Sequence, residues 1–162
     1  MKIYIILFTV IFSSCQSKGQ NKNDNNEFPV KKSEKEWKSE LSEQEYYVLR
    51  QAGTERAYSS DLLNIKTAGT FVCAACGNEL YETKHKFKSG TGWPSFDRAI
   101  EGSISYDSDQ KLGYTRRELL CAACGGHLGH LFDDGPSETT GKRHCINGVA
   151  LDFNPKKDSN EE

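Results

Sequence analysis

The stretch CAACG occupies residues 73–77, and the same five letters return at residues 121–125. Each copy follows a short apolar run typical of a strand, and each ends in glycine, which lets the backbone turn. Two cysteine pairs of this spacing supply four thiolates, the ligand set of a closed tetrahedral zinc site. Soft sulfur ligands also favour zinc over calcium or magnesium. We therefore expect one structural zinc that joins two distant parts of a sheet, bound by Cys73, Cys76, Cys121 and Cys124.

Two other interpretations of these four cysteines stay open. They could form two disulfides, because the chain looks exported and disulfides persist outside the cytoplasm. Either pair could also be a thioredoxin-like redox site, although such a site usually opens a helix in a β-α-β setting that this sequence lacks. The repeated pattern favours zinc over both.

Composition indicates one small domain without a nucleic-acid partner. The chain has 162 residues and a formal net charge of −2, which gives no electrostatic reason to expect nucleic acid. A domain of this size has a small core, so a metal or disulfide staple is plausible. We expect a monomer.

The N-terminus is typical of an exported protein. Lys2 precedes an apolar run over residues 3–12, which is too short for the roughly 20 residues that span a bilayer. We predict a signal peptide over residues 1–15. Its ending, FSSC, resembles a bacterial lipoprotein processing site, so Cys15 is expected to carry lipid and to anchor the protein at a membrane, facing the periplasm or the cell surface. The alternative is an ordinary cleaved signal with an incidental cysteine.

The remaining chain divides into a domain with polar ends. Residues 16–36 are almost all polar and predict a disordered tether, and residues 155–162 predict a disordered tail. The domain is therefore expected over residues 37–154. A capping box at residues 42–45 predicts a helix near its start, with Gly53 as the stop signal.

After this helix the sequence breaks into short β-rich runs separated by turn residues. None of these runs shows sustained helical periodicity, so we predict a mainly β, mostly antiparallel domain with one or two short helices at its start. The runs are GTFVC, ELYET, FDRAI, SISYD, YTRRELLC, HLGHLF and CINGVALDF.

Cys145 is the cysteine left once lipid and zinc take the others. A spare thiol in an oxidising compartment is a liability unless it reacts. On a strand its side chain would share a face with Arg143 and Asn147, and a nearby cation favours the nucleophilic thiolate. The alternative is a buried cysteine that behaves as a small hydrophobe. His144 alternates to the opposite face, so we assign it no role.

Two further motifs suggest chemistry. His127 and His130 form a His-x-x-His pair, for which proton transfer is a better interpretation than metal binding because sulfur already satisfies the zinc. Trp93 lies among glycine and proline in SGTGWPSF, which indicates an aromatic side chain displayed from a loop. For a lone tryptophan, core packing is the default alternative.

Taken together, these residues resemble the B-type methionine sulfoxide reductases, which reduce methionine-R-sulfoxide. The resemblance implies a fold of two antiparallel sheets with the zinc site away from the catalytic pocket. It also implies a peptide-methionine (R)-S-oxide reductase that repairs oxidised exported proteins. The matching segments are AGTERAYS (52–59), GTFVCAACGNELY (69–81), FKSGTGWPSFDRAI (87–100), LLCAACGGHLGHLFDDGP (119–136) and RHCING (143–148).

The resemblance assigns roles by matching motif. Cys145 would be the nucleophile, and Trp93 would form the pocket for the methyl group of the substrate. Polar side chains would complete the site, three around the sulfoxide and two supporting the thiolate and reacting groups: His127, His130 and Asp134, then Arg143 and Asn147.

The implied reaction begins with attack of the Cys145 thiolate on the sulfoxide sulfur. We expect His130 to donate the proton to the oxygen, with His127 assisting, and Cys145 to become a sulfenic acid. Many relatives carry a cysteine in the SGxGWPSF segment that resolves this acid, but here Thr91 stands at that position. We therefore expect an external reductant, a thioredoxin-like protein or a small thiol, to attack the sulfenic acid.

Two other functions remain as alternatives. A non-enzymatic zinc-ribbon interaction module would account for the two CAACG copies but would leave Cys145 incidental. A cysteine hydrolase that uses Cys145 and a histidine has the required residue types as well.

Overall fold

A computed structural model describes residues 28–111 and 113–157 of the chain. The predicted signal peptide, with its lipid site Cys15, lies outside these residues, as does most of the predicted tether 16–36. In the described part of the chain, no helix combines the length and apolar character needed to cross a membrane.

Two short helices open the domain, α1 (Glu34–Glu40) and α2 (Glu43–Gln51). A capping box begins each of them, with Ser33 and Ser42 as the N-caps. The described structure thus starts before the predicted domain boundary at residue 37, because a capped helix begins inside the predicted tether.

The end of α2 differs from the expectation in its detail. Ala52, not Gly53, adopts the left-handed conformation that closes the helix, with φ of 51°. Gly53 instead lies under a neighbouring side chain: a Cβ there would lie 2.3 Å from the ring of Tyr47, which would have to move. The helix therefore ends where the sequence predicted, but the glycine serves close packing.

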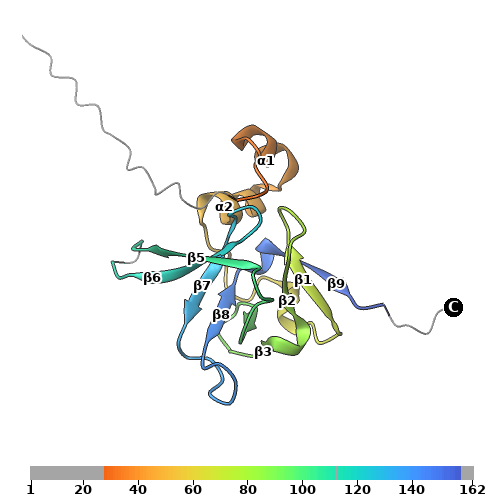
Figure 1. Ribbon diagram of the computed structural model, residues 1–162, viewed down its shortest axis with the longest axis vertical. Helices are drawn as coiled ribbons and strands as arrows, with labels where there is room; N and C mark the ends of the chain where they lie inside the picture. Colours follow the sequence, from red (N-terminus) through yellow and green to blue (C-terminus); the bar gives the residue numbers. More distant parts are fainter. Residues whose placement is uncertain (1–27, 112, 158–162) are drawn as a thin grey trace, which may run out of the picture.

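The described residues form two antiparallel sheets, as the resemblance implied. The smaller sheet has the order β2-β1-β9 and the larger has the order β3-β4-β8-β7-β6-β5. Figure 1 shows the helices gathered at one end, with strands of the two sheets side by side beneath them. The strands are β1 (Gly69–Cys73), β2 (Glu79–Glu82), β3 (Lys86–Phe87), β4 (Ser95–Phe96), β5 (Ile104–Asp109), β6 (Arg116–Cys121), β7 (His127–Phe132), β8 (Arg143–Ile146) and β9 (Leu151–Pro155).

The expected run CINGVALDF is divided between the sheets. Strand β8 ends at Ile146, a 3-10 turn covers Gly148–Ala150, and β9 then starts in the other sheet. The change of sheet places Asn147 in the turn directly after the strand that carries Cys145. FDRAI is likewise mostly loop, since only its first residue belongs to a strand.

Aromatic side chains join the two sheets. Phe71 and Tyr81 of the smaller sheet both contact Phe96 of the larger one, with ring centroids 5.1 and 4.2 Å apart, and all three rings are fully buried. Buried aromatic pairs of this kind contribute large apolar areas to a core. They fix the end of β4 next to β8, which is the neighbourhood of Cys145.

The pairing of β7 with β8 is unusually close at Gly129. A Cβ on this glycine would lie 1.9 Å from the carbonyl oxygen of Cys145. Only glycine therefore allows this pairing, and the pairing sets His130 directly opposite Cys145.

Candidate functional site

A small cavity of about 120 Å³ opens beside Cys145. It brings together four of the site residues predicted from the sequence, which are Trp93, His130, Cys145 and Asn147. Its other lining residues are Thr54, Arg116, Gly129 and Phe132. Residues from three strands, β6, β7 and β8, and from three segments between elements thus line the cavity beside one thiol.

Strand register explains why these residues meet. Cys145 pairs with His130 of β7 on one side and with Ser95 of β4 on the other. Residues directly opposite in antiparallel strands point to the same face, with Cβ atoms about 5 Å apart. His130 is therefore the histidine that faces the thiol.

Burial governs the Cys145 thiol more strongly than charge does. Desolvation raises the pKa of this thiol above its ordinary value, and the positive charge of Arg143 and a hydrogen bond with Thr91 offset only part of the rise. The sequence-based expectation that Arg143 would favour the thiolate is right in sign but not sufficient. In this state the thiol carries its proton at neutral pH.

Arg143 is held beside the thiol by Asp134. Its Nε and Nη2 donate to the two carboxylate oxygens of Asp134, each at 2.8 Å, and its guanidinium lies 4.4 Å from the ring centroid of Phe132. This bidentate bond lowers the pKa of the Asp134 carboxyl. Asp134 does not line the cavity, so its contact with the site is through Arg143.

His130 has carboxylate support that was not predicted. Its Nε2 bonds to Asp109 at the end of β5, and Asp109 in turn accepts two hydrogen bonds from Arg116 Nη2 at 2.9 and 3.2 Å. Burial lowers the pKa of His130, while Asp109 acts in the opposite direction. The imidazole facing the thiol is therefore a neutral base with a carboxylate behind it.

His127 lies behind His130 rather than in the cavity. The two rings meet edge to face, 5.3 Å apart, and Nδ1 of His127 is 2.6 Å from a carboxylate oxygen of Glu118. His127 is buried, and its Nε2 has no hydrogen-bond partner among the described residues. Contact with a substrate in this cavity thus falls to His130.

Glu55 connects three parts of the site, although the sequence analysis gave no role to this residue of the segment AGTERAYS. Its buried carboxylate accepts from the backbone N–H groups of Gly148 and Val149. Its own N–H donates to the side-chain oxygen of Asn147 at 3.0 Å, and its carbonyl accepts from Trp93 Nε1 at 3.3 Å. One residue therefore holds both Asn147 and Trp93 in place around Cys145.

His144 has the structural position that strand alternation predicted. It lies on the other face of β8, buried, with Nδ1 3.2 Å from the hydroxyl of Tyr81. Burial lowers the pKa of His144 to about 4. This histidine belongs to the core.

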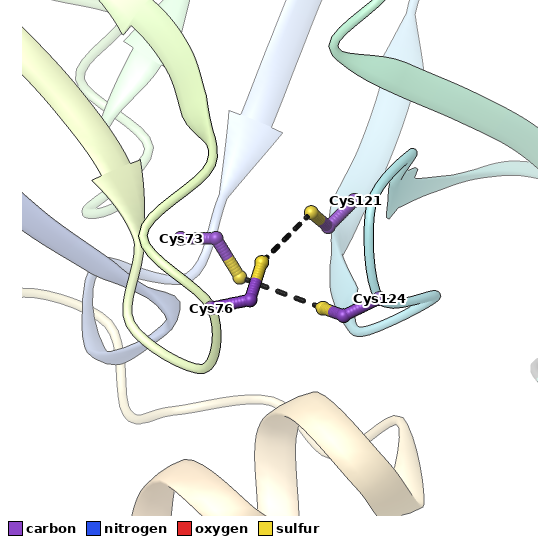
Figure 2. A group of neighbouring side chains, drawn as sticks. All are labelled: Cys73, Cys76, Cys121 and Cys124. Atoms are coloured by element: carbon purple, nitrogen blue, oxygen red, sulfur yellow. Dashed lines mark hydrogen bonds between the residues drawn. The ribbon is translucent and has the colours of Figure 1, made fainter. Parts of the chain in front are cut away.

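The four cysteines of the CAACG copies converge at a second site (Figure 2). Cys73 and Cys76 come from the end of β1, and Cys121 and Cys124 from the end of β6. All four sulfur atoms lie within 4.8 Å of one another, with the closest cross pairs 3.6 and 3.8 Å apart. Disulfide sulfurs are about 2.05 Å apart, so these are free thiols able to hold a metal ion.

The geometry of this cluster suits a tetrahedral thiolate site. A zinc with bonds of about 2.3 Å requires sulfur atoms about 3.8 Å from one another. Without a cation the four sulfurs cannot all ionise: a hydrogen bond with Cys121 raises the pKa of the Cys73 thiol, while one with Cys124 lowers that of Cys121. A divalent ion would remove this conflict because it binds each sulfur as thiolate.

The cysteine cluster and the cavity lie at opposite ends of β6. Arg116 starts the strand at the cavity, and Cys121 ends it at the cluster. Five steps of about 3.3 Å separate them by about 17 Å. A metal in the cluster would therefore take part in folding and not in reactions at Cys145.

Comparison with known proteins shows the family to which the chain is similar. The SelR domain matches residues 41–155. Proteins named peptide methionine sulfoxide reductase MsrB are similar along most of their length. The one from Leifsonia xyli is 47% identical over 80% of this chain and 94% of its own. Those from Methanosarcina mazei and Bradyrhizobium diazoefficiens are 48% and 51% identical, over 82% and 78% of this chain and 95% and 91% of their own.

We expect the alkylation rate of the buried Cys145 thiol to depend on pH in a characteristic way. Because the pKa of Cys145 is raised, its reaction with iodoacetamide should be slow at pH 7 and still increasing above about pH 9. Arg143→Gln should slow the reaction at pH 8.5 by roughly threefold to tenfold, since the offsetting charge is lost. Mass spectrometry of the peptide containing Cys145 separates it from the other thiols.

Lys142→Gln provides the matched control. Lys142 is the cation next to Arg143 in the chain, but it pairs with Asp133, so its removal should leave the alkylation rate of Cys145 unchanged. A rate that is already maximal at pH 7, or that falls in both variants, would contradict this account of the thiol.

Proposed function

The chain belongs to the SelR domain family and is an oxidoreductase that reduces methionine-R-sulfoxide; on that premise we propose a mechanism in which Cys145 takes the oxygen. The observation that carries the proposal is the position of His130 directly opposite Cys145, in a cavity with Trp93 as a wall. Family membership also displaces the zinc-ribbon and cysteine-hydrolase interpretations.

The proton that the sulfoxide oxygen needs comes from the Cys145 thiol and passes through His130. The raised pKa of Cys145 and the lowered pKa of His130 indicate a thiol beside a neutral imidazole. As the sulfur attacks, its proton passes to His130, where Asp109 stabilises the imidazolium. His130 then gives the same proton to the departing oxygen. His127 and Glu118 support the ring from behind.

The first half-reaction needs no other reactant. The bond that Cys145 sulfur forms with the sulfoxide sulfur breaks as the protonated oxygen moves to Cys145, so the methionine sulfur is reduced by two electrons and Cys145 is oxidised to sulfenic acid. The Trp93 ring would hold the methyl group of the substrate. Arg143 and Asn147 would orient the thiolate and the reacting groups, with Asp134 acting through Arg143.

An external thiol completes the cycle. Thr91, whose hydroxyl lies in the same cluster as Ser89 and Ser95, occupies the position where many relatives have a resolving cysteine. The four other described cysteines form the cluster at the far end of β6. Two external thiols would return Cys145 to its reduced form, with release of water and formation of a disulfide in a thioredoxin-like protein or a small thiol.

We further propose that the metal of the cysteine cluster is zinc, one per chain. The support is the all-sulfur ligand set and the spacing of its sulfur atoms. Its role would be to join the end of β1 in one sheet to the end of β6 in the other.

If the cluster binds zinc, the metal content of the protein should depend on its four cysteines. Purified protein should hold one zinc per chain by elemental analysis, and Cys121→Ser should lose it together with several degrees of thermal stability, since structural zinc contributes to folding. Cys145→Ser, the matched control, should keep the zinc. Metal-free protein with the four cysteines oxidised would contradict the proposal.

The mechanism predicts the oxidised form left after one turnover. Reduced protein given one equivalent of a methionine-R-sulfoxide peptide, without reductant, should carry sulfenic acid on Cys145, trapped as a dimedone adduct and identified by mass spectrometry. Thr91→Cys is the control, because a thiol there lies beside Cys145 and should condense with the sulfenic acid, releasing water and giving an intrachain disulfide in place of the dimedone adduct. A disulfide from Cys145 in the unaltered chain would rule out the external-reductant step.

A further inference from the structure

The cavity beside Cys145 holds no more than the end of one side chain. Its volume of about 120 Å³ is room for roughly four waters of about 30 Å³ each. The rest of a polypeptide substrate must lie outside it. A groove of about 810 Å³ shares Trp93 with this cavity, and a volume of that size suits a short peptide segment.

The walls of the groove are held in place by the chain itself. They come from the segments 58–66, 83–90 and 92–95. Tyr58, in the first segment, bonds to both of the others: its N–H donates to the carbonyl of Gly92 at 2.8 Å, and its hydroxyl donates to the carbonyl of Gly90 at 2.6 Å. A groove ordered before binding costs a ligand less conformational entropy.

Register places the groove at a defined distance from the thiol. Phe87 pairs with Ser95, and Ser95 pairs with Cys145, so the three residues lie in line across β3, β4 and β8. Neighbouring strands are about 4.8 Å apart, so Phe87 is about 10 Å from Cys145. An extended peptide covers that distance in about three residues.

The groove carries unbalanced positive charge. Lys66, Lys86 and Lys88 line it, against the single carboxylate of Asp61. Within the described residues none of these lysines forms an ion pair. Burial and then repulsion from Lys66 lower the pKa of Lys86, whose Nζ donates to the carbonyl of Leu63. A carboxylate from a ligand would relieve this repulsion.

We propose that this groove binds the polypeptide on either side of the oxidised methionine and favours Asp or Glu about three residues from it. The proposal rests on the proposed function, since it assigns a substrate preference to the same site. Exposed lysines provide the preference, and the Trp93 wall joins the groove to the reacting thiol.

Steady-state kinetics of the full chain test the preference. The substrates are peptides with a central methionine-R-sulfoxide and Glu, Gln or Lys three residues to each side, together with the capped amino acid N-acetylmethionine-R-sulfoxide amide. We expect the Glu peptide to have a KM about threefold to tenfold below that of the Lys peptide, with similar kcat. Added salt at about 0.5 M should reduce the difference.

Charge-removing variants locate the effect. In Lys66→Gln/Lys88→Gln the difference in KM should fall below about twofold, with kinetics on the capped amino acid unchanged. Lys35→Gln/Lys38→Gln removes two exposed charges from α1 and should keep the preference. Equal KM values for the Glu and Lys peptides, or a preference that survives in the groove variant, would overturn the inference. Failure of the unaltered chain to reduce any of these substrates would instead overturn the proposed function.

Discussion

The site depends on the close antiparallel pairing of β7 with β8. The backbones of the two strands approach too closely at Gly129 for any side chain, since a Cβ there would lie 1.9 Å from the carbonyl oxygen of Cys145. Because this pairing sets the register, it places His130 opposite the thiol and Phe132 opposite Arg143, which is two residues before Cys145 on the same strand. The loops that carry Trp93 and Glu55 then close the cavity around a geometry that the two central strands already define.

Burial, more than the nearby cation, sets the chemical state of this site. It raises the pKa of Cys145 and lowers that of His130, so the proton rests on sulfur while the base beside it is free. Asp109 and Glu118 then stabilise the two imidazoles from outside the cavity. The cysteine cluster lies at the far end of β6, where the ends of β1 in one sheet and β6 in the other place four sulfur atoms that could hold a metal ion.

Local sequence patterns predicted those features that depend on residues close together in the chain, such as a helix start, the face of a strand and a repeated cysteine motif. The capping box identified α2, alternation placed His144 on the face opposite Cys145, and the repeated CAACG identified four cysteines that do converge. Glu55 and Asp109 were not found, because their importance arises only when the chain folds: Glu55 bonds to residues more than ninety positions away, and Asp109 reaches His130 from the end of a hairpin. The division of CINGVALDF between the two sheets could not be predicted from the sequence either, since both halves of this run have the composition of a strand.

In the proposed mechanism, Cys145 removes the oxygen from one epimer of methionine sulfoxide. A single-turnover assay tests it most directly, with separate R- and S-sulfoxide peptides, no reductant, and product methionine counted per chain. The mechanism predicts about one methionine per chain from the R-peptide, none from the S-peptide, and none from either with Cys145→Ser. Reduction by Cys145→Ser, or equal reduction of both epimers, would contradict it.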